Sequence, residues 1–96
     1  MHKFLIHNEG DDVGIATEDI RRGEQVTGVY MDSEETITLS ARGDIPLGHK
    51  IALSDIAKGG EVIEYRVTIG LTTEPIAAGD YVHVHNIRSA RWSFED

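Results

Sequence analysis

Short apolar runs separated by polar turn residues fill the chain and predict a protein made mainly of β-strands. The runs lie at residues 3–7, 13–17, 25–31, 36–41, 61–65 and 67–71. Alternation of apolar and polar positions predicts that the third and fourth runs form one hairpin and the last two another. No stretch keeps a helical period over three turns, and residues 49–57 are the one place where a helix of about ten residues could fit.

A short phrase recurs four times and predicts the corners of the fold. The copies are Ile20-Gly23-Val26, Ile45-Gly48-Ile51, Ile56-Gly59-Val62 and Ile76-Gly79-Val82. An aspartate precedes the isoleucine in three copies, and Pro75 replaces it in the fourth. In our interpretation the aspartate caps a single helical or 3₁₀ turn, and the glycine lets the chain swing into a strand. The starts lie 25, 11 and 20 residues apart, which is too irregular for a solenoid and fits a compact barrel-like or clip-like fold.

The apolar side chains of these strands and corners are expected to form the core. They are Leu5, Val13, Ile15, Ile20, Val26, Val29, Ile37, Leu39, Ile45, Ile51, Leu53, Ile56, Val62, Ile69, Ile76, Val82 and Val84. Each contributes about 1.5–3 kcal/mol when fully buried, which is enough for a small domain.

Two of the five histidines stand two residues apart in the β-favouring run 79–86. In a strand, His83 and His85 share one face with Tyr81, and the valines between them face the other way. Side chains so spaced have roots roughly 6–7 Å apart, so both imidazoles could reach one metal ion or one ligand. Asn86 adds an amide at the end of this run. A solvated strand face with two neutral histidines is the alternative.

A second polar pair, His49 and Lys50, follows the glycine of the second corner, where a turn meets a strand. An imidazole and an ammonium group in this place could transfer protons or hold an anion. For either residue taken singly, the favoured interpretation is an ordinary one, with Lys50 a solvated surface charge and His49 half covering a hydrophobic edge.

Composition narrows the possible functions. A chain of 96 residues forms one domain, and its formal charge of -8 argues against nucleic acid and anionic membranes as partners. It has no cysteine, which excludes disulfides, thiolate metal sites and cysteine nucleophiles. The absence of a signal-like segment and of any apolar run near 18 residues predicts a cytoplasmic protein.

The phrases around both polar groups resemble the N-terminal domain of altronate and galactarate dehydratases. They are Gly48-His49-Lys50-Ile51-Ala52-Leu53 and His83-Val84-His85-Asn86, set among the isoleucine corners, and the resemblance spans nearly the whole chain. That family belongs to the SAF group, which implies a β-clip fold of short strands with small 3₁₀ or helical turns for residues 1–87. The run Asn86-Ile87-Arg88-Ser89-Ala90-Arg91-Trp92 further resembles the ending of the separate small (alpha) subunits of (2R)-sulfolactate sulfo-lyases.

The resemblance implies a lyase subunit that is inactive alone. In this chemistry a 2-hydroxy acid loses the proton beside its carboxylate while sulfite or water leaves the neighbouring carbon. The implied substrate is a small anionic 2-hydroxy acid, the implied cofactor a divalent metal, expected as Fe(2+), and the implied partner a large catalytic subunit. The alternatives are a subunit or domain of an altronate/galactarate-type dehydratase, a non-catalytic SAF ligand-binding module, and a stand-alone metal-dependent hydrolase, which the small size disfavours.

Roles for the site residues follow from the same resemblance. His83 and His85 are expected to bind metal or substrate, and His49 to transfer a proton or bind metal. Lys50 is expected to hold the anionic groups of the substrate, and Asn86 to support the site by a hydrogen bond.

The last residues, 88–96, differ in composition from the rest of the chain. Arg88, Arg91 and Trp92 are of the types enriched at interface hot spots, so this tail is expected to dock on the large subunit. A frayed terminus is the alternative.

Overall fold

The computed structural model describes residues 2–83 and 85–89 of the chain. The strands are β1 (Phe4–Ile6), β2 (Val13–Ala16), β3 (Gln25–Tyr30), β4 (Thr36–Ser40), β5 (Lys50–Ala52), β6 (Glu61–Glu64), β7 (Val67–Thr72), β8 (Tyr81–Val82) and β9 (Ile87–Ser89). This confirms the prediction of a mainly β protein with hairpins at β3–β4 and β6–β7. The region 49–57 forms β5 and the third corner, and no helical or 3₁₀ turn occurs in the described residues. None of these residues therefore forms a helix long and apolar enough to cross a membrane.

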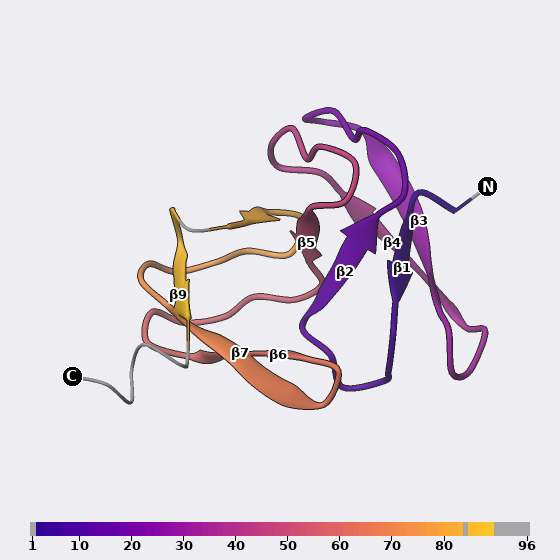
Figure 1. Ribbon diagram of the computed structural model, residues 1–96. Coiled ribbons are helices and arrows are strands. Elements are labelled where there is room, and N and C mark those ends of the chain that lie inside the picture. The colour runs from indigo at the N-terminus through magenta and orange to yellow at the C-terminus, as the bar shows by residue number, and fades with distance from the viewer. Residues whose placement is uncertain (1, 84, 90–96) are drawn as a thin grey trace.

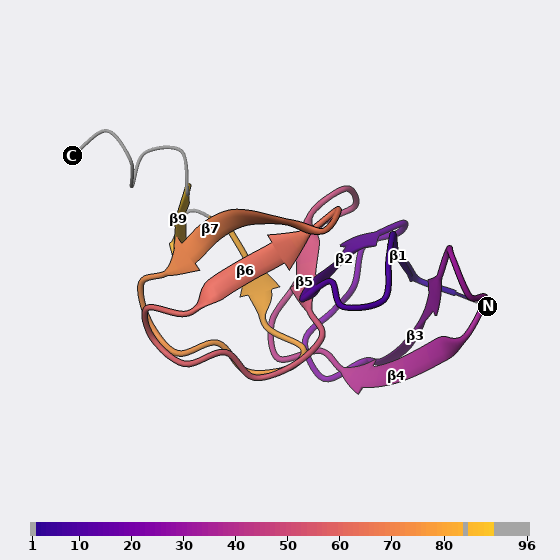
Figure 2. The ribbon, with the colours of Figure 1, turned by 90° about the horizontal axis from the view of Figure 1, so that it is seen from below.

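The strands form two sheets joined at an angle (Figures 1 and 2). The larger sheet has the order β4-β3-β1-β2-β5-β8, and the smaller has the order β6-β7-β9. β1 and β3 run parallel, whereas all other neighbouring strands are antiparallel. The larger sheet curls around one core, and a second core lies between its β2–β5–β8 end and the smaller sheet.

The four corners pair two by two. Ile20 and Ile45 exchange two backbone hydrogen bonds of 2.9 and 2.8 Å, and Ile56 and Ile76 exchange two of 2.8 Å. The first pair is buried in the core of the larger sheet, and the second pair packs in the core between the sheets. Each core is therefore closed by one pair of corners that are distant in the sequence.

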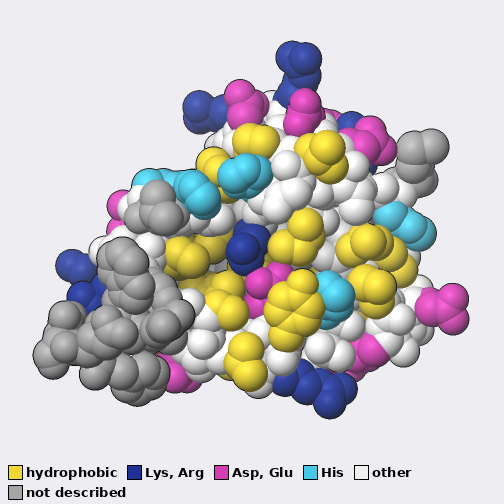
Figure 3. Space-filling view, in the orientation of Figure 1, with side chains coloured by type: hydrophobic (Ala, Val, Ile, Leu, Met, Phe, Trp, Pro, Cys, Tyr) yellow, Lys and Arg dark blue, Asp and Glu magenta, His cyan; other side chains and the backbone are white. Residues whose placement is uncertain are grey.

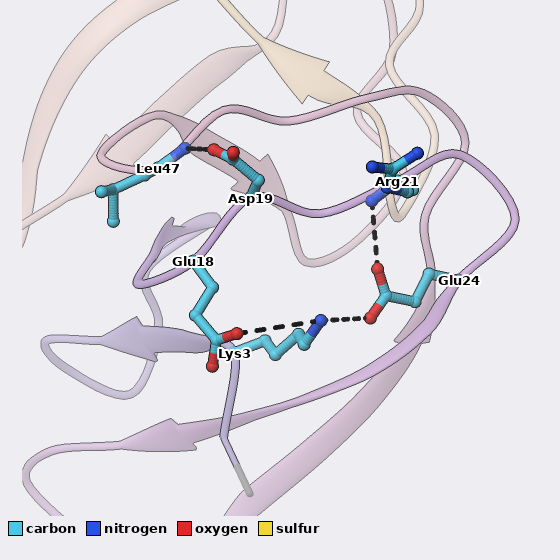
Figure 4. A network of polar contacts seen from close by, with 6 residues as sticks. All are labelled: Lys3, Glu18, Asp19, Arg21, Glu24 and Leu47. Carbon is cyan, nitrogen blue, oxygen red and sulfur yellow. Dashed lines mark hydrogen bonds and ion pairs between the residues drawn. The ribbon is translucent and has the colours of Figure 1, made fainter.

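The aspartates that precede the isoleucines cap the opposite corner of the pair. The bonds are from Leu47 N to Asp19 Oδ1 at 2.9 Å, from Arg22 N to Asp44 Oδ1 at 2.8 Å, and from Ala78 N to Asp55 Oδ1 at 3.0 Å. Figure 4 shows the first of them beside the ion pairs of Lys3. The prediction that each aspartate caps its own turn is wrong, because the pairing brings the free amide of the partner corner against the carboxylate.

Each corner is a tight turn with a left-handed glycine in third position. The turns are closed by hydrogen bonds from Glu24 N to Arg21 O, His49 N to Pro46 O, Gly60 N to Ala57 O and Asp80 N to Ala77 O, at 2.9–3.0 Å. The third residues are Gly23, Gly48, Gly59 and Gly79, with φ of 86°, 84°, 82° and 92°. This pattern is that of a type II turn, in which glycine is favoured at the third position. The corners are therefore type II turns and not the predicted 3₁₀ turns.

Two carboxylates in the β1–β2 loop fasten the smaller sheet to the larger one. Asp12 Oδ2 accepts a hydrogen bond from Ile63 N at 2.8 Å, and Asp12 N donates to Ile63 O at 2.7 Å. The register between β6 and β7 shifts between Val62 and Ile63, and Ile63 lies opposite Thr68 of β7. Asp11, which is buried, accepts bonds from Tyr65 N and Arg66 N at 3.2 and 3.3 Å, in the left-handed turn between β6 and β7.

The core differs from the predicted one in β1. Phe4 and Ile6 are fully buried, and Leu5, which was expected inside, is half-buried. Successive residues of a strand face opposite sides of the sheet. A prediction that is wrong by one residue therefore exchanges the buried and the exposed side chains. Several other side chains expected inside are only half-buried; these are Ile15, Val29, Ile37, Leu39, Ile56 and Ile69. Val84 lies outside the described residues.

The crossed caps can be tested at the pair that closes the second core. Asp55→Ala removes the acceptor of the Ala78 amide and should lower the free energy of unfolding by about 0.5–2 kcal/mol. Urea denaturation followed by circular dichroism measures this. Glu74→Ala, an exposed carboxylate in the corner that lacks the aspartate, is the control and should change stability by less than about 0.5 kcal/mol. Equal stability of both variants would contradict the role of the crossed cap.

Gly28 of β3 provides a second test, because a Cβ there would lie 2.1 Å from the ring of Phe4. Gly28→Ala should therefore destabilise the fold by about 1–3 kcal/mol through overpacking. Gly43→Ala is the matched control, since a Cβ at that position meets nothing within 4 Å. Thermal unfolding of the two variants side by side separates the effect of the ring contact from that of the added methyl group.

Candidate functional site

Four ring side chains, which we call the imidazole cluster, gather where β5 meets β8. They are His49, Tyr81, His83 and His85. The Tyr81 ring lies 5.5 Å, centroid to centroid, from each of the three imidazoles, and the rings of His49 and His83 are 5.2 Å apart. Figure 3 shows histidine side chains next to one another at the upper left of the face drawn, and others apart from them on the same face. The structure thus brings together the two histidine phrases, which are more than 30 residues apart in the sequence.

The Tyr81 hydroxyl fixes the orientation of the His49 ring. Tyr81 Oη and His49 Nδ1 are 2.7 Å apart, a short hydrogen bond between two half-buried side chains. Because Nδ1 is engaged, Nε2 is the ring nitrogen that can meet a substrate. Tyr81 was not among the predicted site residues. Its place on the face of the histidines was the signal that could have identified it.

His49 is available for this contact because its corner contains a proline. At the equivalent positions of two other corners, Glu24 and Asp80 accept the backbone N–H of the residue after the isoleucine, at 3.1 and 2.7 Å. In the second corner that residue is Pro46, which has no N–H to satisfy. A carboxylate cap would have no function there, and His49 occupies the position and turns to Tyr81 instead.

The run 79–86 is a strand only as far as Val82, so the predicted longer strand is wrong. Its partner β5 begins at Lys50, which pairs with Val82, and the residue before it, His49, belongs to the turn of the second corner. Asn86, buried, holds the turn that follows: its Oδ1 accepts the His83 N–H at 3.0 Å, and its Nδ2 donates to Tyr81 O at 2.7 Å. Asn86 therefore positions the backbone of the two cluster residues.

Lys50 lies on the opposite face of the sheet from Tyr81, because Lys50 pairs with Val82 of β8 and successive residues of a strand alternate. Its ammonium group is close to Glu64, a buried carboxylate at the end of β6. Burial raises the pKa of Glu64, and the charge of Asp11 acts in the same direction, while Lys50 and His7 act against it. Lys50 is thus part of the junction between the sheets and lies outside the imidazole cluster.

A shallow pocket of about 320 Å³ adjoins the imidazole cluster. It is lined by Arg42, Gly43, Asp44, Glu74, Asp80, Tyr81, His85 and Asn86. Arg42 is a site residue that sequence reasoning missed, since no motif marks it and only the pairing of distant segments places it here. Its Nε donates to Asp80 Oδ1 at 3.0 Å.

The described residues do not by themselves form a complete ligand set for the expected metal. Among residues 2–83 and 85–89, no group of three or more histidine or carboxylate side chains could hold a metal ion. The ring contacts in this part of the chain join His83 to His49, while His85 contacts Tyr81. The cluster can offer two neighbouring imidazoles, so a complete ligand shell would need donors from elsewhere.

The three residues predicted to bind a partner fall partly outside the described chain. Arg88 is an exposed residue of β9, opposite Leu71 of β7, so the boundary expected after residue 87 falls inside a strand. Arg91 and Trp92 lie outside the described residues.

Comparison with known proteins identifies the family of the chain. Residues 2–90 match the altronate/galactarate dehydratase SAF domain, and the chain belongs to that family. It is 39% identical over 90 residues to the (2R)-sulfolactate sulfo-lyase subunit alpha of Chromohalobacter salexigens, covering 93% of this chain and 96% of that protein. The subunit alpha of Paracoccus pantotrophus is 43% identical over 64 residues, covering 67% and 96%. The altronate dehydratase of Escherichia coli is 43% identical over 79 residues, which are 82% of this chain and 15% of that enzyme.

The buried Glu64 makes a prediction about pH. A carboxyl group with a raised pKa in the folded state binds its proton more tightly there than in the unfolded chain. The free energy of unfolding should therefore fall as pH rises from the usual value of 4.5 through the raised pKa. Glu64→Gln cannot titrate, so it should be more stable than the wild type above this range and should show a flatter pH dependence.

Urea denaturation across about pH 4 to 8 measures this difference. Glu61→Gln is the matched control, because Glu61 is an exposed residue of the same strand. A Glu64→Gln variant with the same pH dependence as the wild type would refute the assignment.

Proposed function

We propose that the chain is the small subunit of a lyase that acts on a small anionic 2-hydroxy acid, (2R)-3-sulfolactate in the first place, together with a large subunit. The observation that carries the proposal is the imidazole cluster, with His49 bonded to Tyr81 and adjacent to His83. Two relatives are named as alpha subunits, and the chain covers 96% of the length of each. This supports a separate small subunit that works with a large one. It corresponds to only 15% and 17% of two altronate dehydratases.

The proposed reaction removes the proton from C2 of sulfolactate and breaks the bond between C3 and sulfur. The electron pair of the C2–H bond forms a double bond between C2 and C3, and the electron pair of the C–S bond leaves with sulfite. The enol then takes up a proton at C3 and becomes pyruvate. The site must therefore bind an anion and take a proton from C2 of the substrate.

His49 is the proton-transfer group in this proposal. Its Nδ1 is held by Tyr81, so Nε2 is aimed by a fixed partner, as a general base requires. His83 is the second imidazole, and its ring centroid lies 5.2 Å from that of His49. The side chain of Asn86 holds His83 in place by accepting the backbone N–H of His83. His85 lines the neighbouring pocket and is placed to contact the substrate.

The large subunit would close the site. The pocket is shallow, His83 and His85 are exposed, and a reaction that forms an enol benefits from the exclusion of water. A divalent metal, expected as Fe(2+), remains part of the proposal. His83 would supply an imidazole ligand, the remaining donors would come from the partner, and the metal would stabilise the charge that develops on the substrate.

The proposal is tested with the chain and its large subunit produced together. His49→Ala and His83→Ala should each lower kcat for sulfite release by about a hundredfold or more, the scale of a proton-transfer group. His2→Ala is the matched control, because His2 is an exposed histidine outside the cluster, and it should leave kcat unchanged. Assembly of each variant is measured by size-exclusion chromatography.

Other outcomes identify the alternatives. Variants that assemble less well but keep full turnover would mark a non-catalytic SAF module. Dehydration of altronate or galactarate without sulfite release from sulfolactate would assign the chain to the sugar-acid dehydratases. Full turnover by the isolated chain would refute the need for a partner.

A further inference from the structure

An anionic substrate beside the imidazole cluster needs a cation, and Lys50 does not provide one on that side. It lies on the opposite face of the sheet from Tyr81, near the buried Glu64. The pocket that adjoins Tyr81 and His85 contains one cationic side chain among its lining residues, Arg42. This arginine is not used by the reaction steps described above.

Close packing of two backbone segments places Arg42 in the pocket. The backbone N–H of Arg42 donates to Gly79 O at 3.0 Å. Gly79 has a φ of 92°, and a Cβ at this position would lie 2.1 Å from Ser40 O and 3.5 Å from Arg42 Cγ. Only glycine permits this approach, which brings Arg42 beside the corner that carries Asp80 and Tyr81.

The side chain of Arg42 is oriented and still able to bind a ligand. Its Nε donates to Asp80 Oδ1 at 3.0 Å, and 61% of the side chain is exposed. Asp80 is itself fixed by the Ala77 N–H at 2.7 Å. The bond to Asp80 uses Nε, which leaves the two Nη groups to donate to an oxyanion in a forked geometry.

The carboxylates of the pocket restrict where an anion can bind. Asp44, Glu74 and Asp80 line the same pocket, and they repel a negatively charged group wherever the guanidinium does not face it. An acid with an oxyanion at one end is therefore oriented with that end at Arg42. The volume of about 320 Å³ admits a molecule of this size.

We propose that Arg42 binds the oxyanion that the substrate carries on C3, which is the sulfonate in sulfolactate. This contact orients the substrate toward His85 and Tyr81. The identity of the substrate rests on the proposed function. The binding of an oxyanion by Arg42 rests on the geometry of the pocket. Arg42 is thus assigned as the residue that discriminates a 2-hydroxy acid with a second anionic group from one without it.

Nuclear magnetic resonance of the isolated full chain tests the binding step directly. Titration with (2R)-3-sulfolactate should shift the Arg42 Nε–H and the amides of residues 42–44 and 80–81. Lactate, which lacks the sulfonate, should shift the Arg42 Nε–H less at the same concentration. Arg42→Gln should weaken sulfolactate binding about tenfold or more, as loss of a charge-assisted hydrogen bond does. Arg42→Lys should be intermediate, because it keeps the charge but not the fork.

Arg66→Gln is the matched control, since Arg66 is an exposed arginine in the turn between β6 and β7 and away from the pocket. It should bind sulfolactate like the wild type. Shifts that are unchanged in Arg42→Gln, or equal for lactate and sulfolactate, overturn the proposal. So does the absence of any shift at Arg42 up to about 50 mM ligand, a concentration that detects even very weak binding.

The assembled enzyme gives an independent readout. Arg42→Gln should raise KM for sulfolactate about tenfold with a smaller effect on kcat and none on assembly. A loss confined to assembly overturns the proposal. An inactive wild-type complex would refute the proposed function alone, because the titration of the isolated chain still decides whether Arg42 binds an oxyanion.

Discussion

The reciprocal bridge between paired isoleucine corners is the interaction on which the rest of the structure depends. Each bridge joins two turns distant in the sequence by two backbone hydrogen bonds. Two crossed aspartate caps reinforce the first bridge, and one aspartate cap reinforces the second. The isoleucines fill the two cores, so the bridges fix both the course of the chain and the packing beneath it. A domain this small has little apolar surface to bury, and the corners satisfy backbone groups that would otherwise remain unpaired at the edge of a core.

The candidate site occurs where one corner departs from the common pattern. Pro46 removes the amide that a carboxylate would cap, and His49 takes the vacated position. The pairing of β5 with β8 brings the fourth corner alongside, so that Tyr81 can bond to His49 and the following turn can present His83. A local rule of the fold is thus broken at the point where polar chemistry is concentrated, as is common at functional sites.

Charge is divided between two places in the molecule. Lys50, Glu64 and Asp11 lie at the junction of the sheets, where both carboxylates are buried and the charges of Lys50 and Asp11 act on Glu64. Arg42 and Asp80 lie at the rim of a pocket beside the imidazole cluster, where a side chain can be both oriented and open to a ligand. Two cations of one small acidic chain therefore have different environments, although the sequence gives no sign of the difference.

Local pattern determined what the sequence could predict. Alternation and turn residues predicted the mainly β fold and both hairpins, and the four glycine corners were predicted from their spacing because positive φ is a property of single residues. Tertiary structure decided which corners pair and which amide each aspartate caps. It also decided that Phe4 and Ile6 fill the core in place of Leu5, that Lys50 lies on the opposite face of the sheet from Tyr81, and that Arg42 enters the pocket. These features depend on the register between distant segments, which follows from the packing of the whole chain and not from any one stretch of it.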